Sequence, residues 1–390
     1  MTEIPIKNSK GCFRQPLFFC DLKIRESMKP FLIICLIFCS HICISQSKLQ
    51  PGFNGKEYAE ALSLSFYSSS IADSVERTKT KDPYHLEYRS DEVGLLNRWS
   101  LYLRNDNVGV INIRGTVQRF ASWLENFYAP MIPATGSLQL DDSTIFNYQL
   151  SGDPKAMVHA GWTIGLGYLA TDIEKKINDY YRQKHVKEFL LFGHSQGGAI
   201  TFLLRSFLEY EKQKGKIPAD IIFKTYCSAA PKPGNLYYAY DFDFITRNGW
   251  AFTIVNTADW VPETPFSIQT INDFNPTNPF IHVKEIIKKE KFIVRLAVKK
   301  VYKKLDKSTE KAQKKFEKSL GKVIYKQVKR FLPHLKEPVY TKGNNYMRTG
   351  SPIILMPDEG YRREFPESNT NFFTHHLFKP YYTLVKKYYF

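Results

Sequence analysis

A short glycine-rich segment of the chain presents a serine in a pattern that suits nucleophilic catalysis. Residues 193–197 read Gly-His-Ser-Gln-Gly, after an apolar run at 189–192 and before a helix-like stretch at 199–211. Glycines at these positions leave room for a sharp turn between a strand and a helix, with the serine hydroxyl exposed above the sheet. The sequence therefore predicts Ser195 as a nucleophile. The alternative is a glycine-rich turn with an incidental serine.

A nucleophilic serine needs a base to take its proton and a carboxylate to orient that base. On a strand–turn–helix scaffold of this type the chain order is serine, acid, histidine. Asp259 fits the acid because it directly follows the apolar run 251–256. Asp241 and Asp243 fit less well, since they follow a Pro-Gly turn rather than a strand. The alternative for Asp259 is a loop carboxylate that caps a turn.

The base must lie beyond Asp259, where the histidines are His282, His334, His375 and His376. The first two flank a lysine-rich stretch. The last two follow the final expected strand and immediately precede a helix, where this architecture would place the base. One member of this pair is therefore expected to be the base, and the choice between the two stays open.

Backbone N–H groups must also stabilise the oxyanion that forms when the serine attacks. Gln196 follows the nucleophile and supplies one N–H. Thr116 is expected to supply the second, because it ends an apolar run in the sequence Arg-Gly-Thr, and its hydroxyl could add a third donor. The alternative is an ordinary turn at the end of a strand.

The elements that would position these residues alternate along the chain. Apolar, β-branched runs predict strands at 108–113, 188–192, 221–228, 251–256 and 352–356. Helical periodicity predicts helices at 57–70, 159–181, 199–211 and the C-terminus, with a short amphipathic stretch at 122–127. Residues 130–155 are expected to form an irregular loop. This alternation favours an α/β fold whose mostly parallel sheet is covered on both faces.

The first residues form a leader distinct from the rest of the chain. Met28-Lys29 precedes an apolar run at 31–44, and Ser45-Gln46 follows it. A positive start, an apolar middle and a small residue at the cut are typical of a secretory signal peptide. We therefore expect residues 1–45 to be a leader whose true start is Met28. Export to the medium, periplasm or cell surface follows, the alternative being an uncleaved membrane anchor.

The remaining residues are expected to form one domain. The chain has 390 residues, of which 43% are apolar, so it can bury a large core. Residues 46–390 are predicted to be a single catalytic domain. Cys227 is the only cysteine beyond the leader, so this domain is expected to have no internal disulfide.

The net charge of +17 belongs mainly to one segment, because residues 282–330 alone carry +13. Apolar residues recur there at helical spacing. They are Ile287, Val294, Val298, Val301, Leu305, Phe316, Leu320, Val323 and Phe331. Two basic amphipathic helices joined near residues 308–309 are expected, as a solvated hairpin on the domain or as a surface that approaches anionic lipid. Nucleic acid is not expected as a partner, because lysine far outnumbers arginine and aromatic residues are sparse.

Five motifs in order resemble the class 3 lipase family of α/β-hydrolases. They are Val110 to Thr116 as the oxyanion strand, Val158-His159-Ala160-Gly161-Trp162 as a helix start, Gly193 to Ala199 around the serine, Ala229 to Asn235 as a turn, and Asn256 to Pro262 as the acid loop. The family often has leucine where this chain has Gln196. The long lysine-rich insert before the last strand is not part of the family pattern.

The resemblance implies an α/β-hydrolase fold with Ser195 as nucleophile, Asp259 as acid, and Thr116 and Gln196 as oxyanion donors. It implies a structural role for His159. His376 aligns better with the family base, and His375 stands where the family usually has aspartate. A lid would lie at 118–133, with Trp123, Leu124, Phe127, Tyr128 and Met131 as its apolar face.

These observations predict an exported serine esterase that acts on lipid acyl esters, in the manner of a triacylglycerol lipase. No cofactor or metal is expected, and the oligomeric state is left open. One alternative is a phospholipase that acts on anionic membranes, recruited by the basic segment 282–330. Another is a non-catalytic surface or binding protein that has kept the fold.

Overall fold

The computed structural model describes residues 47–70, 83–280, 285, 288 and 291–390. Lys48–Phe390 form one compact unit, and the expected signal peptide lies outside the described residues. The described helices include none that is both long and apolar enough to cross a membrane. The one cysteine in the described part, Cys227, is buried and free.

A seven-stranded sheet forms the centre of the unit, in the order β1-β2-β3-β8-β9-β11-β13. The strands β1, β2 and β3 pair antiparallel, and all pairs from β3 to β13 are parallel. The bounds are β1 Tyr84–Arg89, β2 Trp99–Arg104, β3 Gly109–Ile113, β8 Glu188–His194, β9 Ile222–Ser228, β11 Ala251–Asn256 and β13 Ser351–Leu355. The mostly parallel sheet and its flanking helices confirm the predicted α/β-hydrolase fold.

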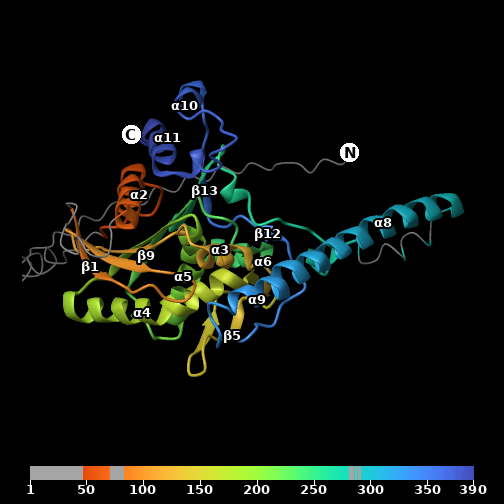
Figure 1. The fold of residues 1–390 in the computed structure, drawn as a ribbon, viewed down its shortest axis with the longest axis horizontal. Helices are drawn as coiled ribbons and strands as arrows, with labels where there is room; N and C mark the ends of the chain where they lie inside the picture. The colour runs from red at the N-terminus through yellow and green to blue at the C-terminus, as the bar shows by residue number, and fades with distance from the viewer. Residues whose placement is uncertain (1–46, 71–82, 281–284, 286–287, 289–290) are drawn as a thin grey trace, which may run out of the picture. The chain divides into compact units, whose positions relative to one another are not determined.

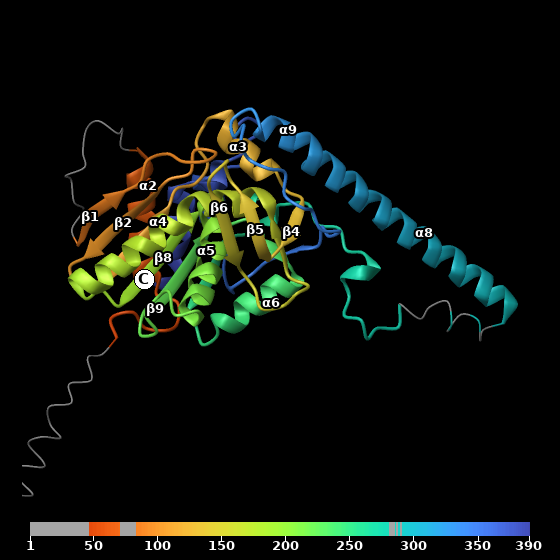
Figure 2. The same ribbon diagram turned by 90° about the horizontal axis from the view of Figure 1, so that it is seen from below.

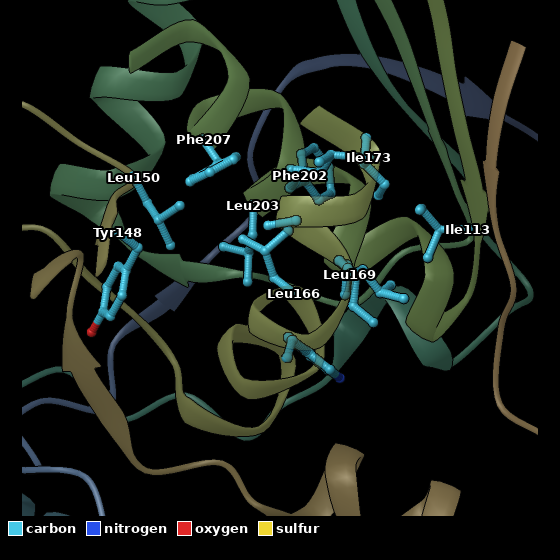
Figure 3. Packing of buried hydrophobic residues seen from close by; sticks show 14 of the residues in the cluster. Ile113, Tyr148, Leu150, Leu166, Leu169, Ile173, Phe202, Leu203 and Phe207 are labelled. Carbon is cyan, nitrogen blue, oxygen red and sulfur yellow. The ribbon is translucent and has the colours of Figure 1, made fainter. Parts of the chain in front are cut away.

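Helices cover both faces of this sheet (Figure 1). One face carries α4 (Ala160–Lys184) and α5 (Gln196–Gln213), and the other carries α2 (Gly55–Ser70) and α11 (Phe378–Tyr389). Strand side chains alternate between the two: Ile111 packs under α4 and α5, whereas Val110 packs under α2 and α11. Figure 3 shows part of the core beneath α4 and α5, which includes Leu169 and Ile173 of α4 and Phe202 and Leu203 of α5.

Smaller elements complete the unit. A short sheet has the order β12-β10-β7-β4, with β4 Met131–Pro133, β7 Met157–His159, β10 Gly234–Asn235 and β12 Tyr346–Met347. Short helices are α3 Phe120–Phe127, α6 Leu236–Ile245 and α10 Glu359–Glu364, and the 3-10 turns are Val261–Glu263, Ile271–Asp273 and Thr374–His376.

The expectation of an irregular loop at 130–155 is wrong. β5 (Thr135–Gln139) and β6 (Ile145–Gln149) form an antiparallel hairpin, and β4 also lies in this stretch. Leu138, Phe146 and Tyr148 alternate with polar residues and enter the core (Figure 3 labels Tyr148). Glycine and serine within β5 and the Asp-Asp-Ser residues between the two strands obscure this period-2 pattern in the sequence.

The lysine-rich segment is also different from the expected helical hairpin. α8 (Phe292–Phe316) continues into a π-helical stretch, Glu317–Val323, and then α9 (Ile324–Val328), without a break at 308–309. Ser308 Oγ donates to the carbonyl of Lys304 at 2.7 Å, and Thr309 Oγ1 donates to that of Leu305 at 3.1 Å. Because each hydroxyl bonds back to its own helix, these residues do not end it.

Candidate active site

Ser195 occupies a sharp turn between β8 and α5. Its backbone has φ 60° and ψ −130°, a strained conformation for a residue other than glycine. A Cβ on Gly193 would lie 2.2 Å from the carbonyl oxygen of Gly197, and a Cβ on Gly197 would lie 2.3 Å from that of Ile113. Only glycine fits at either position, so the sequence motif has a steric cause. The turn leaves the Ser195 side chain half-buried at the carboxyl edge of the sheet.

Asp259 and His376 meet at the same edge. Asp259 follows β11, and its Oδ2 atom lies 2.7 Å from Nδ1 of His376. The hydroxyl of Tyr381 donates to the same oxygen at 2.8 Å, and the N–H of Val261 donates to Oδ1 at 3.0 Å. Both members of the pair are buried. With Nδ1 facing the carboxylate, Nε2 is the ring nitrogen left to exchange a proton with a hydroxyl.

His376 also packs against the residue that precedes the serine. The rings of His194 and His376 have centroids 4.8 Å apart, and His194 Nε2 lies 2.8 Å from the carbonyl oxygen of His376. Among the described residues no hydrogen bond joins Ser195 Oγ to the His376 ring. In unliganded enzymes such bonds are often long and tighten only with substrate.

His194 is a neutral positioning group. Burial, followed by the proximity of His376, lowers the pKa of His194 well below its usual value. A carbonyl can only accept, so Nε2 of His194 carries the hydrogen and Nδ1 accepts from Ser228 Oγ at 3.0 Å. The hydroxyl of Tyr58 completes the chain, 2.7 Å from Ser228 Oγ. This chain ties the His376 backbone to Ser228 of β9 and to Tyr58 of α2, on the face of the sheet that α2 and α11 cover.

His375 points away from the Asp259 carboxylate. Its Nδ1 lies 2.8 Å from the hydroxyl of Tyr361, on which its ring stacks, and its carbonyl accepts from Asn256 Nδ2 at 3.0 Å. The adjacent histidines therefore have separate environments, and only His376 is paired with Asp259. The sequence alone did not decide which of the two histidines pairs with the acid.

The other candidates are placed elsewhere. His334 Nδ1 lies 2.7 Å from the Asp142 carboxylate on the surface, and His282 is outside the described residues. Asp241 accepts from the Tyr210 hydroxyl at 2.8 Å, and Asp243 accepts from the Gly350 N–H at 2.7 Å. Neither acid has a histidine partner among the residues that the structure describes.

Thr116 and Gln196 lie side by side at the expected oxyanion position. A Cβ on Gly115 would lie 2.9 Å from the carbonyl oxygen of His194 and 3.7 Å from Cβ of Ser195, so this loop passes close to the nucleophile turn. Thr116 Oγ1 donates to Gln196 Oε1 at 2.8 Å and accepts from Asn126 Nδ2 at 2.9 Å. The one hydrogen of the Thr116 hydroxyl is therefore donated to Gln196. The structure therefore differs from the expectation that it serves as a third oxyanion donor.

A buried carboxyl group supports the Gln196 side chain from behind. Gln196 Nε2 donates to Asn97 Oδ1 at 3.3 Å, and Asn97 Nδ2 donates to Glu125 Oε2 at 2.6 Å. Burial raises the pKa of Glu125 to about 8, so its neutral form predominates near pH 7. The sequence analysis missed Glu125, Asn97 and Tyr381, because nothing in their local sequence distinguishes them.

His159 has the structural role that the resemblance implied. Its Nδ1 accepts from the Trp162 N–H at 3.2 Å and so caps α4, and its ring stacks on Trp162 at 3.6 Å between centroids. Burial lowers the pKa of His159 to about 3. The residue is therefore a neutral cap rather than a base.

The expected apolar lid face is partly wrong. Leu124, Tyr128 and Met131 are buried, because α3 packs on α4 and β4 pairs with β7. Only Trp123 and Phe127 lie on the outer side, where they stack with centroids 6.2 Å apart.

Aromatic residues that the sequence analysis missed extend this outer surface to the histidine. Phe373 contacts Trp123 at 5.8 Å, Trp260 at 5.5 Å and His376 at 5.9 Å between centroids. Phe127 and Trp260 are half exposed. An apolar substrate could therefore approach His376 across exposed aromatic rings.

Part of the chain is similar to known lipases. Residues 110–269 match the family model for lipase (class 3), a segment that includes Thr116, Ser195, Gln196 and Asp259 and ends before His376. The chain is 30% identical over 118 residues to the secreted mono- and diacylglycerol lipase MDL4 of Malassezia globosa, covering 29% of this chain and 35% of the relative. It is 31% identical over 110 residues to secreted mono- and diacylglycerol lipase 3 of Gibberella zeae, covering 28% and 33%.

The chain thus spans about a third of the length of these relatives. Among solved structures, a deletion mutant of the Rhizomucor miehei lipase propeptide complex is similar with a TM-score of 0.40 and 17% identity, covering 54% of this chain and 62% of that one. A triacylglycerol lipase from Penicillium expansum has a TM-score of 0.40 and 14% identity, covering 55% and 75%.

Proposed function

We propose that this chain is a serine esterase that hydrolyses the acyl esters of lipids, and the match of residues 110–269 to the class 3 lipase family model supports this proposal. The observation that carries the proposal is the 2.7 Å contact between His376 Nδ1 and Asp259 Oδ2, made beside the strained turn that holds Ser195. We propose that residues 46–390 act as one catalytic domain.

In the proposed reaction, Ser195 Oγ attacks the ester carbonyl carbon while His376 Nε2 takes the hydroxyl proton. Asp259 holds the imidazole in the required tautomer and stabilises its positive charge. The N–H groups of Thr116 and Gln196 donate to the oxyanion, each such donor being worth about 3–4 kcal/mol in the transition state. His376 then protonates the leaving alcohol, and an acyl-enzyme remains. Water activated by His376 releases the fatty acid and restores Ser195.

The outer surface and the relatives both support a proposal for the substrate class. The partly exposed aromatic rings that lead to His376 through Phe373 favour an aliphatic acyl chain over a polar one. The similarity to secreted mono- and diacylglycerol lipases supports partial glycerides as substrates and export of this chain, with the expected signal peptide as the means. A phospholipase remains the alternative, and turnover of diacylglycerol against anionic phospholipid vesicles separates the two.

A Ser195→Ala variant tests the proposal. We expect the purified variant to lose at least about 10⁴-fold in kcat on p-nitrophenyl butyrate, because the nucleophile is gone while the oxyanion donors remain. A Ser143→Ala variant is a suitable control, since that serine is exposed and its hydroxyl donates to Asp141 between β5 and β6, away from Ser195. Hydrolysis by the Ser195→Ala variant at the parent rate would overturn the proposal.

A further inference from the structure

The outer part of α8 carries an apolar stripe that nothing in the described part of the chain covers. Val294, Val298, Val301 and Leu305 are spaced by four, three and four residues, so they lie on one face of the helix. Their exposed fractions are 46%, 42%, 59% and 63%. No residue between Phe292 and Ala312 is buried. The helix extends away from the sheet in both views (Figures 1 and 2).

Lysines occupy the remaining faces of the same stretch. They are Lys299, Lys300, Lys303, Lys304, Lys307 and Lys311, and all are exposed. None forms an ion pair within the part of the chain that the structure describes. Asp306 and Glu310 are the only acids between Phe292 and Phe316, so the positive charge of this face is largely unbalanced.

The inner end of the same helical run is anchored beside the candidate active site. α8 continues into α9 and the residues that follow it, where Val328 and Leu335 are buried in the core. Tyr325 stacks on Tyr128 with centroids 6.3 Å apart, and Phe331 contacts Phe120 of α3 at 6.3 Å. A 25-residue helix is roughly 38 Å long, so α8 presents its stripe well away from this anchor.

We propose that α8 is a docking helix for an anionic phospholipid surface. A narrow aliphatic stripe bordered by lysines is the pattern of a helix that lies in a membrane interface, with the stripe at the boundary of the acyl chains and the ammonium groups at the phosphates. Nucleic acid would use the lysines and leave the stripe exposed. A second copy would cover the stripe but bring two lysine-rich faces together. The lipid surface satisfies both features at once.

The docked helix would hold the α3 side of the domain close to a lipid surface. Docking rests on α8 alone, so it is separable from the proposed ester hydrolysis and is measured without turnover. Substitutions are preferable to deletion of residues 282–330, because deletion would remove Val328 and Tyr325 from the core.

The test is co-sedimentation of the full chain with vesicles, comparing phosphatidylcholine alone with a mixture of phosphatidylcholine and phosphatidylglycerol. A lysine variant changes Lys299, Lys300, Lys303 and Lys304 to glutamine, and a stripe variant carries Val301→Gln and Leu305→Gln. We expect at least tenfold stronger binding to the anionic vesicles. The lysine variant should weaken that binding by about 100-fold and the stripe variant by about tenfold.

Two matched controls carry the same changes elsewhere. One changes the exposed lysines Lys175, Lys336, Lys379 and Lys386 to glutamine, and the other carries Val339→Gln and Met356→Gln. Both should bind anionic vesicles within about twofold of the parent chain, since neither alters α8. Circular dichroism checks that every variant is folded.

Several results would overturn the proposal. Equal binding to both kinds of vesicle would do so, as would losses in the controls as large as in the α8 variants. Unchanged binding by the stripe variant would mean that the lysines alone hold the chain on anionic vesicles and that the apolar stripe does not contact the lipid. Tighter binding to a DNA duplex than to vesicles would indicate nucleic acid instead. Self-association that the stripe variant abolishes would indicate a second copy of the chain.

Discussion

Nδ1 of His376 lies 2.7 Å from Oδ2 of Asp259, although 117 residues separate the two in the chain. The acid follows β11, whereas the histidine follows β13 and α10, on the far side of the lysine-rich segment. Because β11 and β13 are parallel neighbours, their carboxyl ends bring both residues to one edge of the sheet. The proposed chemistry depends on this pairing.

Replacing the acid tests that dependence. An Asp259→Asn variant should keep the fold but reduce kcat on a soluble ester by about 10³–10⁴-fold, because an amide favours the wrong tautomer of the histidine. Steady-state kinetics measure the loss. Asp241→Asn is the control, since its partners are Tyr210 and Gly152. A loss of less than tenfold in Asp259→Asn would contradict the assigned role.

The two adjacent histidines provide a second, internally controlled comparison. His376→Ala should lower kcat by at least about 10³-fold, because it removes the group that moves the proton. His375→Ala should lower it by less than tenfold, since that side chain contacts Tyr361 rather than Asp259. The reverse order of effects in the same ester assay would show that the base has been assigned to the wrong residue.

The choice within this pair illustrates what sequence can decide. The runs before Ser195 and Asp259 are largely apolar, so these two strands were predictable from the sequence. Adjacent residues in a 3-10 turn point in different directions, and which of them meets Asp259 depends on the path of β13, α10 and the loop between them. That path is set by tertiary contacts, such as the hydroxyl of Tyr361 with His375, which leave no local pattern.

The expectations that the structure corrects also have physical causes. Ser308 and Thr309 resemble a helix break, but their hydroxyls bond back to the helix. The apolar residues Leu124 and Tyr128 suggested a lid face, but apolar residues near a site serve the core as readily as a substrate. Only the packing of α3 on α4 separates these two uses.

The Thr116 hydroxyl gives a prediction about the oxyanion position. Its hydrogen bond to Gln196 Oε1 means that it orients Gln196 rather than the oxyanion. A Thr116→Val variant keeps the backbone N–H, so kcat should fall by about tenfold rather than the 10²–10³-fold that follows loss of a direct donor. A Thr116→Ser variant should retain near-parent kcat. A loss near 10³-fold in the valine variant would favour direct donation.

Glu125 gives a prediction about stability and pH. Burial raises its pKa from 4.5 to about 8, so between these values the folded chain keeps a proton that the unfolded chain has released. Unfolding then releases a proton, and rising pH lowers the free energy of unfolding by about 1.4 kcal/mol per pH unit from this group. A Glu125→Gln variant has no ionisable group at this position, so it lacks this contribution to the pH dependence of stability.

The measurement is urea unfolding of the parent and the variant at several pH values. Between pH 5 and pH 7 the stability of Glu125→Gln should rise relative to the parent by about 3 kcal/mol, and the difference should level off above about pH 8. A difference in the free energy of unfolding that does not change with pH would mean that Glu125 is ionised in the folded chain.

The most direct test of the central claim is intact-mass spectrometry after treatment with a fluorophosphonate. An activated serine displaces fluoride and keeps the phosphonyl group, whereas an ordinary hydroxyl does not react. We predict one adduct per chain, mapped by peptide sequencing to Ser195, absent in Ser195→Ala and formed at least about 100-fold more slowly in His376→Ala. An unlabelled parent chain, or an adduct that persists in Ser195→Ala, would contradict the account.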